Sequence, residues 1–350
     1  MDNVESLIRS FQSSGLYTHV YVACGFLNHS DVLYQRALAP DDRNIFDLSS
    51  LTKALVTTPL TLAHTLRAAR SANDTTLLDL YGAKACSEFG EYVANLTLSQ
   101  ALRHETGLPA WRNFYVECEG HRQSLTESLQ RALGDGFNRR PQNKNHSELY
   151  SDIGFMILGR LIERRAGRKL DEEWADFAKS IGFNNFLSLG SSAMIDSSRA
   201  VPTAFCPVRG RELAGEVHDE NAWAMGGFTG HTGLFGSGPS VCEFMQRLWQ
   251  SDLGNKIVMA NFDQASSSGD SLLGWRKGSD LSSRAFASGR GCGHLGFTGT
   301  AFWVDPQSRA FAVVLTNRVI SGRIPGLAIK DMRSQAFAGL WEILQANMKP

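Results

Sequence analysis

The chain has 350 residues, of which 43% are hydrophobic and 20% are charged. This composition is typical of a globular protein and excludes the disordered and fibrous classes. Lys plus Arg and Asp plus Glu each number 35, so the formal net charge is zero. Without a basic run or an aromatic-basic stripe, nucleic acid and anionic membrane surfaces are not expected partners. We therefore expect a small-molecule or short-peptide substrate, and composition leaves the oligomeric state open.

The N-terminal segment lacks the basic n-region and apolar h-region of a signal peptide, and no window approaches about 18 uninterrupted apolar residues. Six cysteines, at positions 24, 86, 118, 206, 242 and 292, are scattered along the chain without a Cys-x-x-Cys motif or a Cys/His cluster at metal-binding spacing. Such a pattern is typical of free thiols in a reducing compartment. The sequence thus predicts a cytoplasmic protein with no metal site.

The first predicted elements are a helix and a hairpin. An amphipathic helix is indicated by apolar residues at i, i+3, i+4 and i+7, namely Val4, Leu7, Ile8 and Phe11. The runs 17–26 and 32–38 are rich in β-branched and aromatic residues and flank a turn, so they predict a β-hairpin. After Ser50 an apolar segment extends to about Leu66, and Pro59 inside it is expected to kink the helix.

Helical patterns dominate from there to about residue 200, as in 98–103, 124–133 and 153–164. Strand signals return in 300–304 and 310–315, and a closing helix is predicted over 332–348. Early and late strands with helices at both termini predict an α/β (α+β) fold with one antiparallel sheet flanked by the N- and C-terminal helices. We expect residues 1–70 together with 205–350 to form the sheet region and residues 71–204 to form an inserted, mainly helical (all-α) region. The cleft between them is the expected active site.

Ser50 and Lys53 form a Ser-x-x-Lys pair at the start of the apolar helix. Three residues make nearly one helical turn, so the lysine amine lies over the same face as the serine hydroxyl, with Cβ atoms roughly 5–6 Å apart. A hydroxyl with an adjacent base is the first requirement of acyl transfer. A capping serine followed by a solvated lysine has the same spacing, so the pair needs partners elsewhere in the chain.

Two further segments supply such partners. Tyr150-Ser151-Asp152 stands just before an apolar helix, where a tyrosine is either functional or a packing residue. The segment Gly293-His294-Leu295-Gly296-Phe297-Thr298-Gly299-Thr300 runs into a strand, and its glycines either allow a ligand to approach backbone donors or make a tight turn. In order and broad spacing the three elements match one known set of motifs, Ser-x-x-Lys, Tyr-x-Asn-like and Lys-Thr-Gly-like.

Through these motifs the chain resembles the serine β-lactamase and penicillin-binding protein superfamily, in the branch with class C β-lactamases, DD-peptidases, D-aminopeptidases and related esterases. The resemblance covers most of the chain and includes the segments 46–53, 104–109, 218–222, 226–227, 230–235 and 315–318. It implies a β-lactamase/transpeptidase-like fold, in which the active site lies between an α/β sheet region and an all-α region.

The resemblance also implies residue roles. Ser50 would attack a carbonyl to give an acyl-enzyme, while Lys53 and Tyr150 handle its proton and later that of the attacking water. The backbone N–H groups of Ser50 and Phe297 would form the oxyanion hole. No metal or cofactor is required. The expected substrate-binding residues are Asp152, His294, Gly296 and Phe297.

Two departures from the family motifs bear on specificity. His294-Leu295-Gly296 stands where Lys-Thr-Gly is common, a pattern that resembles esterase-like members, and Asp152 stands where Asn is usual. Both changes remove positive potential that attracts a substrate carboxylate. With an ordinary pKa of about 6.5, His294 is expected to be mostly neutral at pH 7 and to become protonated near pH 6. If Asp152 faces Lys53 it favours the ammonium form, so Lys53 and Tyr150 are best treated as one coupled pair.

The sequence therefore predicts a serine hydrolase that acts on a small ester or amide. Within the same chemistry, the alternative is a β-lactamase, D-Ala-D-Ala carboxypeptidase or D-aminopeptidase acting on cell-wall peptides. The alternative from another class is a penicillin-recognising binding module that is acylated without turnover. His231 is either a residue behind the site or a packed loop histidine, and Cys292, close to His294, leaves a catalytic thiol as a further alternative.

Overall fold

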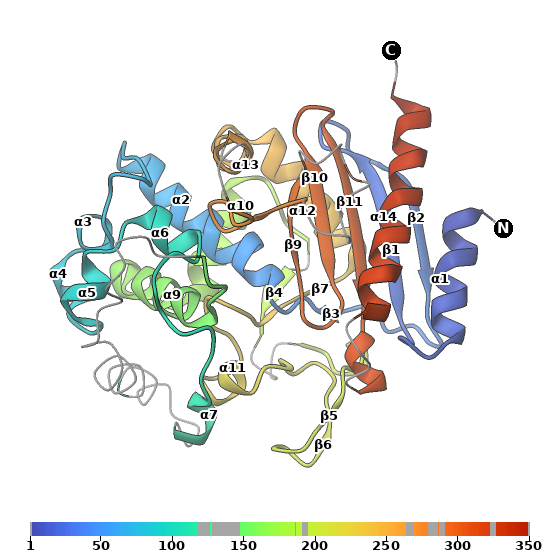
Figure 1. The fold of residues 1–350 in the computed structure, drawn as a ribbon, viewed down its shortest axis with the longest axis horizontal. Helices are drawn as coiled ribbons and strands as arrows, with labels where there is room; N and C mark the ends of the chain where they lie inside the picture. Colours follow the sequence, from blue (N-terminus) through green and yellow to red (C-terminus); the bar gives the residue numbers. More distant parts are fainter. Residues whose placement is uncertain are drawn as a thin grey trace.

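The structure is a computed structural model that describes residues 2–117, 127, 148–185, 187–190, 195–263, 269–278, 286, 291–322 and 327–348. A six-stranded antiparallel sheet has the strand order β2-β1-β11-β10-β9-β8 (Figure 1). Its strands come from both ends of the chain, which confirms the predicted α/β fold. They are β1 (Val20–Phe26), β2 (Val32–Leu38), β8 (Arg276–Lys277), β9 (Cys292–Leu295), β10 (Ala301–Asp305) and β11 (Ala310–Thr316).

The central strands are buried on both faces because helices cover each side of the sheet. Successive residues of a strand point to opposite faces. Accordingly, Val22 and Val314 belong to one hydrophobic core, whereas Tyr21 and Leu315 belong to the other. Helices α1 (Asn3–Ser13) and α14 (Leu327–Asn347) cover the first face and pack against each other, and α12 (Gly238–Gln250) covers the second (Figure 1). The predicted flanking helices at the two ends of the chain are confirmed.

The other helices gather mainly at the left of Figure 1, where α9 is the central one and packs against α2, α3, α4, α6 and α10. The predicted helices 98–103 and 153–164 are present as α6 and α9, whereas 124–133 lies almost wholly outside the described residues. The helices other than α1, α12 and α14 have these bounds: α2 (Thr58–Arg67), α3 (Leu77–Tyr81), α4 (Ala83–Cys86), α5 (Gly90–Ala94), α6 (Leu98–Leu102), α7 (Phe114–Glu117), α9 (Asp152–Ala166), α10 (Leu170–Ser180), α11 (Glu220–Ala224) and α13 (Asp252–Asp263).

A small three-stranded sheet leads the chain to Ser50. It has the order β3 (Phe46–Asp47), β7 (Leu234–Gly236) and β4 (Leu187–Leu189), and a separate pair is formed by β5 (Phe205–Cys206) and β6 (Arg211–Glu212). Because β3 ends at Asp47, the segment 48–50, which leads to Ser50, begins where the sheet stops. The carbonyl of Leu234 then accepts the N–H of Leu48 at 2.9 Å, which fixes the exit of the chain from the strand.

The helix after Ser50 differs from the prediction at Pro59. Residues Lys53–Thr57 form a π-helical turn, in which the N–H of Thr58 donates to the carbonyl of Lys53. Helix α2 begins directly afterwards, so Pro59 stands in its first turn, where the missing N–H is tolerated. The proline therefore does not kink the middle of a long α-helix. Single π-helical turns inside helices are frequent at functional sites, and this one contains Lys53.

Cys24, Cys86, Cys206, Cys242 and Cys292 are buried free thiols. Within the described ranges, no group of three His, Cys, Asp or Glu side chains is arranged to hold a metal ion. Among the same residues, no helix combines the length and the apolar character that crossing a membrane requires.

Candidate active site

Ser50, Lys53 and Asp152 meet where the π-helical turn faces the start of α9. The Nζ atom of Lys53 donates to Oγ of Ser50 at 3.0 Å and to the carbonyl oxygen of His231 at 3.1 Å, and it lies 2.7 Å from Oδ1 of Asp152. The Lys53 side chain has 0% of its surface exposed, against 20% for Asp152. A lysine ammonium has three protons to donate, and here it has these three oxygen neighbours. The alternative of a solvated lysine is therefore wrong.

The protonation state of Lys53 results from opposing effects on its pKa. Burial is the largest effect and lowers the pKa, because the charged form loses its hydration. The charge of Asp152 and the charge and hydrogen bonding of Tyr150 act in the other direction, and the net pKa lies above the ordinary value of 10.5. Lys53 is thus an ammonium ion at neutral pH, as expected for a lysine facing Asp152. In this state it donates to Ser50 and cannot accept the serine proton.

Tyr150 lies over Lys53, with Nζ 5.0 Å from the centre of its ring. The rings of His104 and His294 are centred 4.4 Å and 6.2 Å from that of Tyr150. The tyrosine therefore lies beside both the helical turn that carries Lys53 and the region at the end of β9. The structure brings together all three residues predicted to be catalytic, and His294 beside them.

The segment that carries Tyr150 is anchored on both sides. The hydroxyl of Ser151 caps α9, and its N–H donates to Nδ1 of His104 at 3.0 Å. On the other side, the Glu148 carboxylate accepts from the hydroxyl of Ser271 at 2.6 Å. Burial, followed by the charge of Lys53, lowers the pKa of His104 to about 3, so this histidine is a neutral acceptor. His104 was not among the predicted site residues, although its segment carried part of the family resemblance.

His294 is buried at the end of β9 and its tautomer is fixed. Nδ1 lies 2.9 Å from the carbonyl oxygen of Leu295. Because a carbonyl oxygen only accepts, Nδ1 carries the proton and Nε2 has a free lone pair. Burial, then the charges of Lys53 and Arg276, lower the pKa of His294 well below 6.5. The expectation that His294 becomes protonated near pH 6 is therefore wrong.

Hydrogen bonds join the segment before Ser50 to the turn after β9. The N–H of Phe297 donates to Oγ of Ser49 at 3.3 Å. The hydroxyls of Thr298 and Thr300 donate to the carbonyls of residues 47 and 48 at 2.8 Å and 3.0 Å. Gly296 has no room for a side chain, since a Cβ there would lie 2.0 Å from Oγ1 of Thr300. The segment that precedes Ser50 is thus held in register with Phe297.

Ser49 and Asp47 determine the course of the chain just before Ser50. Ser49 has a positive φ of 50°, a strained conformation for a residue other than glycine. Its N–H donates to Oδ1 of Asp47 at 2.8 Å, and the N–H of His218 donates to Oδ2 at 2.7 Å. Burial raises the pKa of Asp47 to about 6 despite these two bonds. Neither residue was singled out from the sequence, because their importance depends on contacts with distant segments.

His231 lies behind Lys53. Its carbonyl contacts the ammonium, while its ring is within hydrogen-bond distance of Oδ1 of Asp219, at 3.2 Å, and of the hydroxyl of Thr229. The backbone of His231 therefore contacts the site, whereas its buried ring packs away from Ser50 as a loop histidine does. Cys292 is buried, and burial raises the pKa of its thiol. A reactive thiol needs a lowered pKa, so Cys292 is not suited to be the nucleophile.

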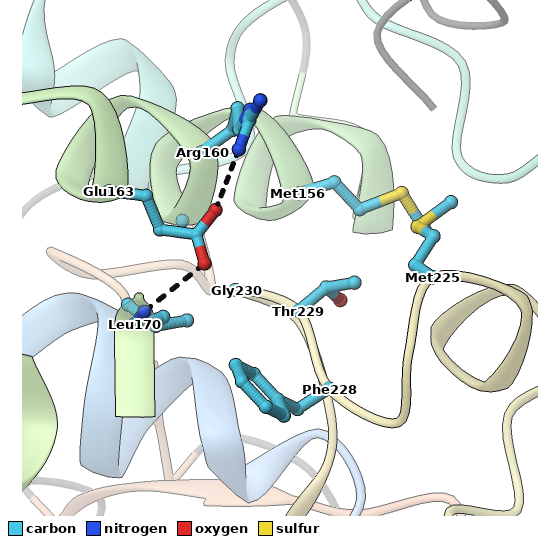
Figure 2. A pocket seen from close by; sticks show the side chains of 9 residues that line it. Met156, Arg160, Glu163, Leu170, Met225, Phe228, Thr229 and Gly230 are labelled. Atoms are coloured by element: carbon cyan, nitrogen blue, oxygen red, sulfur yellow. Dashed lines mark hydrogen bonds and ion pairs between the residues drawn. The ribbon is translucent and has the colours of Figure 1, made fainter. Parts of the chain in front are cut away.

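The loop that carries His231 packs directly on α9. A Cβ on Gly230 would lie 2.0 Å from the carbonyl oxygen of Phe155, so only glycine allows this approach. Beside the contact is a cavity of about 30 Å³ (Figure 2), which is room for roughly two water molecules. Its lining contains none of the predicted site residues and consists of Met156, Gly159, Arg160, Glu163, Leu170, Met225, Phe228, Thr229 and Gly230.

Known proteins resemble the chain in sequence. The family model described as Beta-lactamase matches residues 18–335. A Salmonella agona (strain SL483) protein named "Putative D-alanyl-D-alanine carboxypeptidase" is 29% identical over an alignment of 250 positions, which covers 64% of this chain and 57% of that protein. The chain thus matches little more than half of the length of this relative.

Solved structures share the fold. A class C beta lactamase from Rhodobacter sphaeroides has a TM-score of 0.66 at 15% identity, with 98% of each chain covered. EstCE1, described as a hydrolase with promiscuous acyltransferase activity, has a TM-score of 0.61 at 17% identity, with 95% of this chain and 97% of that chain covered. At these identities the likeness shows the fold. Together with the family match over most of its length, it establishes that the chain belongs to the beta-lactamase family and is a serine hydrolase.

Proposed function

We propose that this serine hydrolase cleaves a small neutral ester or amide through an acyl-enzyme at Ser50. The observation that carries the proposal is the buried Lys53 ammonium, 3.0 Å from Oγ of Ser50 and paired with Asp152. A solvent-exposed lysine beside a serine would have no comparable control of its protonation. Here burial and one carboxylate determine that state together, as is common for groups that move protons.

Lys53 and Tyr150 transfer protons as a coupled pair. An ammonium cannot take the serine proton, so one proton must leave the pair before Ser50 can give up its own. Nζ of Lys53 lies 5.0 Å from the centre of the Tyr150 ring, so the two groups lose and regain this proton as a pair, and neither alone is assigned as the base. The pair then protonates the leaving group and later accepts a proton from the water that attacks the acyl-enzyme.

The N–H groups of Ser50 and Phe297 stabilise the tetrahedral oxyanion. In the free protein the Phe297 N–H donates to Oγ of Ser49 at 3.3 Å. The developing oxyanion takes over this donor from a neutral hydroxyl. Because a hydrogen bond to a charged acceptor is stronger than one to a neutral acceptor, the exchange favours the transition state over the ground state.

Two features favour a neutral substrate. His294 is neutral where a lysine cation is common in the family, because burial lowers its pKa well below 6.5. Large apolar side chains are also exposed on segments that carry or adjoin the site, with 52% of Phe297, 48% of Leu149 and 45% of Trp111 accessible. Exposed apolar side chains near a catalytic serine suit an apolar acyl or leaving group.

One observation favours a second candidate, a carboxypeptidase that cleaves peptides ending in D-alanine. The charge of Arg276 acts on both His294 and His104. Arg276 pairs with Gly293 across β8 and β9, one residue before His294. A cation near this strand could receive a substrate carboxylate in place of the missing lysine. The named relative from Salmonella agona points to the same reaction.

Steady-state and burst kinetics separate these functions. The substrates are p-nitrophenyl butyrate, benzylpenicillin and an acyl-D-Ala-D-Ala peptide. We expect the ester to give the highest kcat/KM and to turn over repeatedly. A peptide rate above the ester rate that is lost in Arg276→Gln would establish the carboxypeptidase instead. A stoichiometric burst without turnover for every substrate would establish the binding module.

A further inference from the structure

The Nε2 atom of His294 is a buried acceptor without a partner. The His294 side chain is 1% exposed, and Nε2 has no hydrogen bond to any residue that the structure describes. A change of tautomer cannot turn Nε2 into a donor, because the proton stays on Nδ1, where it is donated to the carbonyl oxygen of Leu295. Buried polar atoms are nearly always paired, so an exception at this position calls for a partner that arrives from outside the chain.

The surroundings of Nε2 place it beside the reacting groups. His294 is three residues before Phe297, the proposed oxyanion donor, and its ring is centred 6.2 Å from that of Tyr150. The proposed mechanism has Tyr150 pass a proton to the leaving group. A partner for Nε2 is therefore a group carried on the leaving-group side of the substrate.

The chemistry of that partner follows from charge. A lone pair repels a carboxylate, and the positive charges of Lys53 and Arg276 that act on His294 disfavour a second cation next to it. A neutral N–H or O–H group fits both conditions.

We propose that Nε2 of His294 accepts a hydrogen bond from a neutral N–H or O–H on the leaving group, so that the enzyme selects esters and amides that carry such a donor. This inference rests on the proposed acyl-enzyme mechanism. It assigns to His294 a positive selection for a donor, beyond the absence of a carboxylate-binding cation.

Three esters of one acid test the selection: the glycolamide ester, the N,N-dimethylglycolamide ester and the glycolate ester. They differ only at the end of the leaving group. The glycolamide ester carries an N–H donor, the dimethylated ester has no N–H, and the glycolate ester carries a carboxylate. In the wild type we expect the glycolamide ester to react about tenfold faster, in kcat/KM, than the dimethylated ester, as one neutral hydrogen bond allows. The glycolate ester should be the slowest.

Variants separate the hydrogen bond from size. His294→Leu removes the acceptor. The ratio of kcat/KM between the glycolamide ester and the dimethylated ester should then fall to the value that their difference in size alone produces. His294→Gln offers a carbonyl acceptor and should restore part of the ratio. The control variant His29→Leu removes an exposed histidine in the β1–β2 turn and should leave the ratio between the two esters unchanged.

An equal ratio in the wild type and in His294→Leu would overturn the inference. So would an equal loss of rate for all three esters in His294→Leu, since His294 would then act on Tyr150 and not on the substrate. The wild-type ratio needs no variant to fold: a value near one contradicts the inference directly. A wild type that none of the esters acylates at Ser50 would instead refute the proposed mechanism.

Discussion

The backbone N–H of Phe297 donates to the hydroxyl of Ser49, across 248 positions of the sequence. Ser49 directly precedes the proposed nucleophile, so this bond links the two backbone donors assigned to the oxyanion hole. Ser49 makes this bond while its φ angle is 50°, a strained conformation for a residue other than glycine.

Replacing Ser49 separates the hydroxyl from the backbone conformation. The bond to Ser49 holds the Phe297 N–H in position before the oxyanion takes it over. If this orienting effect outweighs the competition from the hydroxyl, Ser49→Ala and Ser49→Gly lower kcat/KM for a neutral ester by a similar factor of about ten, less than the roughly 10²–10³ for loss of a whole oxyanion donor. Ser49→Gly should be about 1 kcal/mol more stable than Ser49→Ala, because glycine adopts positive φ without strain. Ester kinetics and urea unfolding measure the two effects. Wild-type rates in both variants would show that the Ser49–Phe297 bond has no catalytic consequence.

Removing the carboxylate of Asp152 should shift the pH dependence of the reaction. In Asp152→Asn, burial becomes the dominant influence and the pKa of Lys53 falls, because the main effect that raised it is gone. We expect the acidic limb of the kcat/KM profile to move to lower pH by about one unit or more. An unchanged limb would show that Lys53 does not control the rate.

A change in protein stability with pH does not distort this kcat/KM profile. The pKa of Lys53 in the folded wild type lies above 10.5, so its ion pair stabilises the fold fully below the unfolded value of about 10.4. That contribution is lost only as pH rises through the folded pKa. Between pH 6 and 9 it is constant, and urea unfolding of the wild type in this range provides the control.

Replacing Tyr150 by phenylalanine tests its share in proton transfer. Tyr150→Phe should lower kcat by roughly 10²–10⁴-fold, the usual contribution of a general acid–base group, while KM changes little. Tyr92→Phe is the matched control, because it also removes a hydroxyl, one that donates to the carbonyl of Thr106 at 2.6 Å. Near-normal turnover of Tyr150→Phe from pH 6 to 9 would identify Tyr150 as a packing residue.

Asp47 should make the fold more stable as the solution becomes acidic. Its pKa is raised from 3.8 to about 6 by burial, so the native state binds a proton more tightly than the unfolded state does. The free energy of unfolding therefore increases by up to about 3 kcal/mol as pH falls from about 6 to about 4. Asp47→Asn should remove this component. Urea unfolding at pH 4.5 and pH 7 compares the two proteins, and parallel pH dependences would contradict the account.

The sheet and the Ser50–Lys53 pair could be predicted because each depends on local pattern. The alternation along β1 and β11 follows from strand geometry, and the spacing of Ser50 and Lys53 follows from one helical turn. The π-helical turn at Lys53–Thr57 could not be predicted, since Pro59 permits either a kink or a new helix start.

The protonation state of His294 also could not be predicted from the sequence. Its residue type suggests protonation near pH 6, but its pKa is set by burial and by Lys53 and Arg276, which lie far from it or on another strand. Likewise Ser49 and Asp47 acquire their partners, Phe297 and His218, from segments more than a hundred residues away. Residue type and spacing identified which motifs meet, and the tertiary contacts decide the charge and orientation of each group.

The central claim is that Ser50 is the acylated nucleophile. Intact-protein mass spectrometry with peptide mapping, after rapid quenching of a reaction with p-nitrophenyl butyrate, tests it most directly. The account predicts one butyryl group on Ser50 in the wild type, more of it in the slowly deacylating Tyr150→Phe if acylation persists, and none in a folded Ser50→Ala. An adduct on Cys292, or full turnover by Ser50→Ala, would contradict the account.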